Sequence, residues 1–278
     1  MMRSTGVLMI AFAGVHAFAQ ISPILPSEDS LSNRSRRRVN ANVSTAKPDP
    51  KVVVFVGDRV IPQFVDGGGW KTSVTMVNLE NHPTSFQVLF FRDDGSDLAV
   101  PVVGQGVVIG MNVALNTAGS ATFETAGIGA NVAQGWAMLS QTTNDSVGAF
   151  AIFRETGTGQ EAVVPVVNQF ESHFVMPYDN TASFVTGAAF ANPSSQAVVI
   201  PLNIRNEAGQ IIDQRTISLG AFAHVAFSVP ATWGSTQGIR GAIEFTTSGF
   251  GIGALGLRFN GAAFTSFSVL ENFNWVVP

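Results

Sequence analysis

Short apolar runs rich in β-branched and aromatic residues recur along this chain about every ten positions, with turn residues between them. Val52–Val56 is such a run, Thr72–Leu79 alternates between two faces, and Ser85–Arg92 leads into an Asp-Asp-Gly turn. Further runs lie at Ala121–Thr125, Gly135–Gln141, Gly148–Arg154, Ala197–Arg205, Ile211–Leu219, His224–Val229, Ala242–Thr247, Gly251–Phe259 and Phe264–Leu270. Beyond the first twenty residues, no window of a dozen residues shows the period of an amphipathic helix. The pattern predicts an all-β fold of antiparallel β-sandwiches, immunoglobulin-like or jelly-roll-like.

The composition is that of a folded protein whose stability comes from its core. Charged residues make up 12% of the chain, about half the usual share, and hydrophobic residues make up 46%. These values exclude an intrinsically disordered chain. The chain has no cysteine, which excludes disulfides, thiolate metal ligands and a cysteine nucleophile. Its 278 residues are enough for two domains.

An internal repeat relates the two halves of the sequence. Trp70–Asn78 and Phe184–Asn192 both begin with an aromatic residue, carry Thr at the third position and end in Asn, at an offset of 114 residues. Ala118–Phe123 matches Phe222–Phe227 at an offset of 104. The first copy therefore has about ten extra residues, which we expect within Ala99–Met111.

The repeat and the change in composition near the N-terminus divide the chain into four expected segments. Residues 1–19 are a signal peptide and residues 20–50 a flexible leader. Two β-sandwich domains follow at 51–160 and 170–278, joined near Thr156–Ser172. Because each copy has its own set of strands, we expect each domain to have its own core.

The first nineteen residues have the parts of a secretory signal peptide. Arg3 supplies a positive charge, Val7–Ala19 is an apolar run of 13 residues, and Ala-Phe-Ala precedes the expected cleavage between Ala19 and Gln20. The run is too short to span a membrane as a mature helix, which takes about 20 residues. We expect a secreted protein, or one at the periplasm or cell surface, with no transmembrane segment after processing.

Charge is divided unevenly along the chain. The leader contains the basic run Asn33–Arg38, which is solvated or marks a processing site. Residues 60–278 carry seven Lys or Arg against fifteen Asp or Glu, a net charge of −8. Nucleic-acid affinity comes largely from cations that neutralise phosphates, so we expect no nucleic-acid partner.

Two short motifs carry a resemblance to known proteins. Pro62–Trp70 precedes a strand that ends at Asn78, and Met176–Asn180 precedes Phe184–Gly187 in the second copy. These segments resemble tandem β-sandwich proteins secreted by soil bacteria, especially acidobacteria, and the resemblance covers most of residues 55–275. It implies a secreted β-sandwich protein, and it brings no catalytic residues because that family has no assigned activity.

The candidate ligand-binding residues lie at corresponding corners of the two copies. They are Asp66 and Trp70 in the first copy, and Tyr178 and Asp179 in the second. Three glycines between Asp66 and Trp70 allow positive φ and close approach of the backbone. An exposed Trp70 would stack on a sugar ring, whereas a buried Trp70 would cover the end of the core. We favour the core position for Trp70 and keep the sugar platform as the alternative.

Asp93, Asp94 and Asp97 place three carboxylates within five residues, as oxygen-rich calcium-binding turns do. No Glu follows at the distance that a calcium loop uses, and Asp-Gly is by itself a favoured hairpin turn. We therefore expect no cofactor, with calcium at these three residues as the alternative.

No catalytic residues are predicted. Gly251–Gly256 fits the pattern G-x-G-x-x-G, but a strand rather than a helix is expected after it. Neither H-E-x-x-H nor G-x-S-x-G occurs in the chain. Glu124, Asp145 and Glu244 are isolated carboxylates, and they would serve a glycosidase only if the fold paired them.

The sequence as a whole predicts an exported, non-catalytic β-sandwich protein with a cell-surface, adhesive or extracellular-matrix role. Its expected partner is an extracellular polysaccharide or another surface protein. Two alternatives stay open. One is a carbohydrate-binding module, with or without calcium, and the other is a hydrolase that acts on glycans.

Overall fold

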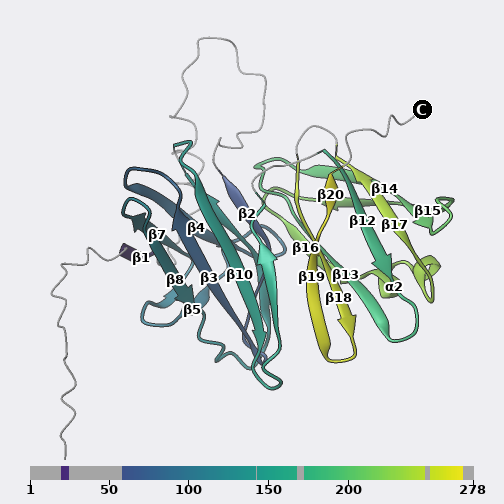
Figure 1. Cartoon of the computed structure of the whole chain (residues 1–278), viewed down its shortest axis with the longest axis horizontal. Helices are drawn as coiled ribbons and strands as arrows, with labels where there is room; N and C mark the ends of the chain where they lie inside the picture. The colour runs from purple at the N-terminus through teal and green to yellow at the C-terminus, as the bar shows by residue number, and fades with distance from the viewer. Residues whose placement is uncertain (1–19, 25–57, 142, 168–171, 248–250, 272–278) are drawn as a thin grey trace, which may run out of the picture.

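Four antiparallel sheets stack in pairs as two β-sandwiches that lie side by side (Figure 1). This arrangement confirms the predicted all-β sandwich fold. The computed structural model describes residues 20–24, 58–141, 143–167, 172–247 and 251–271.

The first sandwich consists of a five-stranded sheet and a four-stranded sheet. In spatial order the five-stranded sheet contains β1 (Gln20–Ile24), β7 (Gly110–Leu115), β4 (Thr84–Phe91), β9 (Ala133–Ser140) and β2 (Arg59–Asp66). The four-stranded sheet contains β11 (Glu161–Pro165), β10 (Val147–Glu155), β3 (Trp70–Asn78) and β8 (Ser120–Glu124). A separate hairpin is formed by β5 (Val100–Val102) and β6 (Gly106–Val108). Alternate residues of β3 and β4, such as Val74 and Val88, are fully buried between the two layers.

The second sandwich also pairs five strands with four. Its five-stranded sheet contains β15 (Ile211–Leu219), β14 (Val198–Asn206), β17 (Arg240–Thr246), β12 (His173–Asp179) and β20 (Leu270–Glu271). Its four-stranded sheet contains β16 (His224–Ser228), β13 (Phe184–Ala191), β18 (Gly253–Asn260) and β19 (Ala263–Ser268). The short helices α2 (Val229–Thr232) and η1 (Gly234–Thr236) connect β16 to β17. Ile200, Ile243 and Phe190 are fully buried in its core.

The two sandwiches share one strand order. The order β7-β4-β9-β2 corresponds to β15-β14-β17-β12, and β11-β10-β3-β8 corresponds to β19-β18-β13-β16. They differ in their outer strands, since β1 lies beside β7 whereas β20 lies beside β12. They also differ in the β5–β6 hairpin, which lies inside Ala99–Met111, where the sequence repeat places the extra residues of the first copy.

A pair of buried asparagines makes the same hydrogen bonds in both sandwiches. Asn78 Nδ2 donates to the carbonyl oxygens of His82 at 2.7 Å and Asn116 at 2.9 Å. Asn192, 114 residues later, makes the corresponding pair of bonds, one of them to the carbonyl oxygen of Gln196 at 2.6 Å. Each asparagine thus links the turn that follows its own strand to a second turn of the same sandwich. This role explains the Asn at the end of the repeated sequence motif.

The second sandwich contributes side chains to the core of the first. Strand β13 is buried on both faces, because Ala188 and Phe190 face the second core while Ala189 and Ala191 contact the first sandwich. Leu255 of β18 joins Ala189 in the first core. The expected separate cores are therefore connected. The reason is the row of alanines on β13, which lets the sheet approach the first sandwich closely.

Aromatic rings also pack between the two sandwiches. The Phe91 ring stacks on Trp136 with centroids 4.5 Å apart and on Phe222 with centroids 5.4 Å apart. The fully buried Trp136 donates from Nε1 to the carbonyl oxygen of Phe222 at 2.8 Å. Phe222 comes from the second sandwich, so this cluster fixes the two sandwiches to each other.

Two expected boundaries differ from the structure. Strand β11 pairs with β10, so the first sandwich continues beyond the expected end at residue 160. Gln20–Ile24, expected to be part of a flexible leader, forms β1 and pairs in antiparallel register with β7 from Ala114 to Gly110. The open edge of β7 offers these residues backbone partners, and a proline is tolerated in an edge strand. The signal peptide and residues 25–57, which include the predicted strand Val52–Val56, lie outside the described residues.

Candidate functional site

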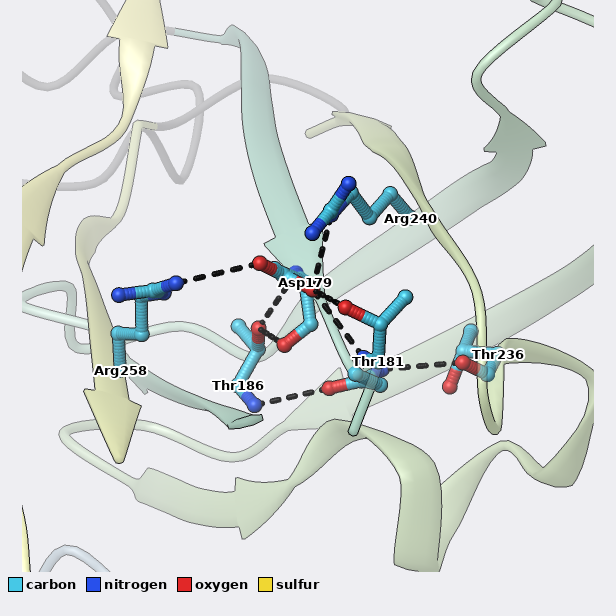
Figure 2. Close-up of polar contacts among 7 residues, drawn as sticks. Asp179, Thr181, Thr186, Thr236, Arg240 and Arg258 are labelled. Atoms are coloured by element: carbon cyan, nitrogen blue, oxygen red, sulfur yellow. Dashed lines mark hydrogen bonds and ion pairs between the residues drawn. The ribbon is translucent and has the colours of Figure 1, made fainter. Parts of the chain in front are cut away.

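A cluster of charged side chains surrounds Asp179 at the end of β12 (Figure 2). Asp179 Oδ1 lies 3.1 Å from Arg240 Nε, and Oδ2 accepts a hydrogen bond from Arg258 Nη2 at 3.2 Å. Arg240 comes from β17 and Arg258 from β18, so the carboxylate connects the two sheets of the second sandwich. The Arg240 and Arg258 side chains stay partly exposed, at 50% and 40%, whereas the Asp179 side chain is 19% exposed.

The turn between β12 and β13 fixes the position of Asp179. Thr181 donates to Asp179 Oδ1 from its hydroxyl at 2.7 Å and from its backbone N–H at 3.1 Å. The Thr186 hydroxyl accepts from the Asp179 N–H at 2.9 Å and lies 3.1 Å from the Asp179 carbonyl oxygen. Buried Asn180 accepts from the Thr186 N–H at 2.8 Å. The Asp-Asn-Thr sequence therefore forms a turn that satisfies its own polar groups.

The electrostatics of the cluster favour an ionised carboxylate. Burial would raise the pKa of Asp179, but the hydrogen bonds from Thr181, Arg258 and Arg240 outweigh it and hold that pKa far below its ordinary value. The Arg258 guanidinium also lies over the Phe184 ring, 3.6 Å from its centroid. One carboxylate thus lies between two guanidiniums, one from each sheet of the second sandwich.

An open groove of about 700 Å³ lies directly beside the Asp179 cluster. Its wall includes Thr181, Asn206, Glu207, Ile212, Ser235 and Arg240. Hydroxyl, amide, carboxylate and guanidinium groups are all present in this wall, and they can donate to or accept from a polar ligand. Arg240 and Thr181 belong to both the groove and the Asp179 cluster, so Asp179 positions two groove residues.

The first-copy candidates, Asp66 and Trp70, are both enclosed at least in part by the protein. Asp66 is buried, and its Oδ1 accepts from the Gly127 N–H at 2.8 Å. Trp70 is half-buried against the first core, with its ring edge-on to Phe264 of the second sandwich at 5.2 Å between centroids. A Cβ on Gly67, which has φ +75°, would lie 2.5 Å from a carbonyl oxygen, so this turn requires glycine.

Tyr178 and Asp179 have different environments although they are neighbours in sequence. The Tyr178 side chain is buried in the second core, where its hydroxyl donates to the carbonyl oxygen of Arg205 at 3.0 Å and burial raises its pKa. The offset of 114 residues aligns Tyr178 with Phe64, which is fully buried in the first core. The fold thus places Asp179 beside the groove and Tyr178 inside the protein.

In the candidate calcium turn, the carboxylates of Asp93 and Asp94 have different partners, and Asp97 is contacted through its backbone carbonyl. Asp93 Oδ1 lies 2.8 Å from Nδ1 of buried His224, and Asp94 Oδ1 accepts from the Ser96 hydroxyl at 2.6 Å and its N–H at 2.9 Å. The Arg92 side chain donates to the Asp97 carbonyl oxygen at 3.1 Å. Among the residues that the structure describes, no three His, Asp or Glu side chains come together as metal ligands would.

Glu244 is the most enclosed carboxylate of the second sandwich, with 5% of its side chain exposed. Oε2 accepts from Arg205 Nη2 at 2.8 Å and Nε at 3.1 Å, and Oε1 lies 3.1 Å from His173 Nε2. Burial would raise the pKa of Glu244, but Arg205, His173 and Asn203 hold it below its ordinary value.

The other two carboxylates considered for a hydrolase belong to the first sandwich. Glu124 lies 3.8 Å from Lys71 Nζ, and Asp145 accepts from the Thr84 hydroxyl at 2.6 Å. Each of the three carboxylates, Glu244 included, therefore has its own set of partners.

Sequence reasoning selected Asp179 but missed Arg240 and Arg258. Arg240 and Arg258 follow Asp179 by 61 and 79 residues in the sequence. They come close to Asp179 only because β12 pairs with β17 and because the two sheets stack on each other. One indication was available, since residues 60–278 contain only seven Lys or Arg. An isolated arginine within a β-strand is most stable next to a carboxylate partner.

The fold and this cluster define the protein as a two-sandwich, all-β protein with an open groove at one end. Comparisons with known protein families, with curated proteins and with solved structures find no match for the chain. No helix in the described part of the chain is long and apolar enough to cross a membrane.

Proposed function

We propose that this chain is an exported, non-catalytic protein of the cell surface or extracellular matrix, and that it binds polysaccharide or another surface protein. The observation that carries the proposal is the ionisation of three carboxylates that are held in ion pairs and hydrogen bonds. Asp179, Glu244 and Asp93 all have pKa values below their ordinary value. A general acid needs the opposite shift, toward neutral pH, so ion pairs of this kind support a structural role.

Carbohydrate binding at the groove is the second candidate, and the groove wall favours it. Thr181, Ser235, Asn206 and Glu207 present hydroxyl, amide and carboxylate groups, which suit the many hydroxyls of a sugar chain. The half-exposed Arg240 adds a fixed positive charge. The groove is open rather than enclosed, as binding to the side of a long polymer requires.

A glycan array tests carbohydrate binding at the groove against binding to a protein partner. The chain is applied as wild type and as Glu207→Ala, which removes an exposed groove carboxylate without touching the Asp179 cluster. The matched control is Glu161→Ala, an exposed glutamate on β11 of the first sandwich. Carbohydrate binding predicts that Glu207→Ala weakens the signal about tenfold, as expected for one or two lost hydrogen bonds, while the control does not. Absence of any glycan signal for the wild type would leave a protein partner as the candidate.

A further inference from the structure

Strand β15 forms an open edge of the second sandwich. It is nine residues long, and in the part of the chain that the structure describes it pairs with β14 alone. Most of its side chains are exposed, including Ile211 at 48% and Ile212 at 37%. The strand contains no Lys or Pro, two residue types that protect natural edges from pairing.

The first sandwich shows that this edge accepts another strand. Strand β7 holds the position that β15 holds in the second sandwich, and β1 covers its outer side. The offset of 104 residues aligns Gly110–Ala114, the part of β7 that β1 covers, with Gln214–Ser218 of β15. The same backbone position is therefore covered in one sandwich and, among the described residues, has no outer partner strand in the other.

The charges of β15 complement a second copy of the strand. Asp213 and Arg215 lie on the same face of the strand, on either side of Gln214, with Arg215 Nη2 2.8 Å from Asp213 Oδ2. If two antiparallel copies of β15 meet with Gln214 opposite Gln214, each Asp213 lies opposite the Arg215 of the other copy. Cross-strand pairs of opposite charge are favourable, whereas a register centred on Asp213 or on Arg215 places like charges opposite each other.

We propose that two copies of this chain associate through β15, antiparallel about a twofold axis at Gln214, and so join their five-stranded sheets into one. A twofold axis uses the same surface on both copies, so the contact closes as a dimer. Self-association goes beyond the proposed surface role and does not depend on which ligand the groove binds.

A cysteine scan tests the register, because the chain has no cysteine of its own. Gln214→Cys places two thiols directly opposite each other, with Cα atoms about 5.5 Å apart, within the range for a disulfide. Thr216→Cys is the matched control, also exposed and on the same face of β15. In the proposed register, residue 216 of one copy is offset by four positions along the strand from residue 216 of the other. Their Cα atoms are then about 13 Å apart, which is too far for a disulfide.

Under mild oxidation, Gln214→Cys should form a covalent dimer and Thr216→Cys should stay largely monomeric. Equal cross-linking of both variants, or of neither, overturns the proposal. Sedimentation equilibrium gives a second readout without cross-linking. Arg215→Asp should weaken the dimer about tenfold by placing like charges opposite each other, and Asp213→Arg with Arg215→Asp should restore it. A wild-type chain that stays monomeric up to about 1 mM also overturns the proposal.

Discussion

His224 Nδ1 lies 2.8 Å from Asp93 Oδ1, and this contact joins the two sandwiches. The His224 side chain is fully buried, whereas about half of the Asp93 side chain is exposed. The His224 N–H also donates to the Asp93 carbonyl oxygen at 3.0 Å, and Gln134 Nε2 donates to Asp93 Oδ2 at 2.9 Å. The turn that contains Asp93, whose sequence resembles a calcium-binding loop, therefore forms a contact between the two sandwiches.

Asp93→Asn should destabilise the protein, and the effect should depend on pH. Burial opposes ionisation of Asp93, but the bonds with His224 and Gln134 lower its pKa in the folded state. Its contribution is therefore present above about pH 4, the ordinary pKa of Asp, and is lost as the pH falls toward the lower folded value. We expect about 1 kcal/mol at pH 7, because half of the side chain is in solvent.

Urea denaturation of wild type and Asp93→Asn at pH 7 and pH 3 measures this difference. The gap between their unfolding free energies should shrink at the lower pH. Asp94→Asn, whose carboxylate binds Ser96 within the same turn, is the control for a general effect of removing a charge. A gap that is the same at both pH values contradicts the role given to Asp93.

Asp179→Asn should leave Arg240 and Arg258 without their counter-charge. Its folded-state pKa is lowered, so its contribution is also present above about pH 4 and lost below. We expect a loss of about 1 kcal/mol at pH 7, allowing for screening of the exposed guanidiniums. Thermal denaturation checks this, with Glu161→Gln as an exposed ion-pair control. Equal melting temperatures for Asp179→Asn and wild type would show that the cluster contributes nothing to stability.

Trp70→Ala should destabilise the protein by about 2–3 kcal/mol, somewhat less than a fully buried tryptophan. The ring is half-buried on the first core and touches Phe264 of the second sandwich. Phe150→Ala on β10 is the matched control, because that ring is 39% exposed and should matter little. Melting temperatures decide between the two roles considered for Trp70. An unchanged value for Trp70→Ala would favour the sugar platform.

A fragment of residues 20–167 should be markedly less stable than the whole chain. It lacks Ala189 and Leu255 from the first core, and it exposes the Phe91 and Trp136 rings to water. Circular dichroism and binding of a hydrophobic dye to the isolated fragment measure this. A fragment that unfolds cooperatively near the melting temperature of the whole chain would mean that the shared core adds little.

The strands and the repeat could be predicted because they depend on local pattern. Alternation along Thr72–Leu79 and the Asn at the end of each repeated motif both correspond to features of the fold. The N-terminal strand was missed because Gln20–Ile24 is five residues long, contains a proline and depends on the edge of β7 for its partners. Whether these residues form a strand depends on the partner strand beside them and not on their own sequence.

The shared core and the Asp179 cluster could not be predicted from local pattern. Ala189 and Ala191 look like ordinary small residues of a strand, and only the docking of the two sandwiches shows that they face another core. Arg240 and Arg258 reach Asp179 from two different sheets. Such contacts depend on tertiary packing, which strand periodicity does not encode.

The most direct test of the central claim is to incubate the protein with extracellular polysaccharides and to measure binding and new reducing ends together. The account predicts retention on at least one insoluble polysaccharide or on a surface protein, with no increase in reducing ends over a heat-inactivated sample. Release of new reducing ends that is lost in Glu244→Gln would contradict it, because it would show that a carboxylate assigned here to an ion pair acts in catalysis.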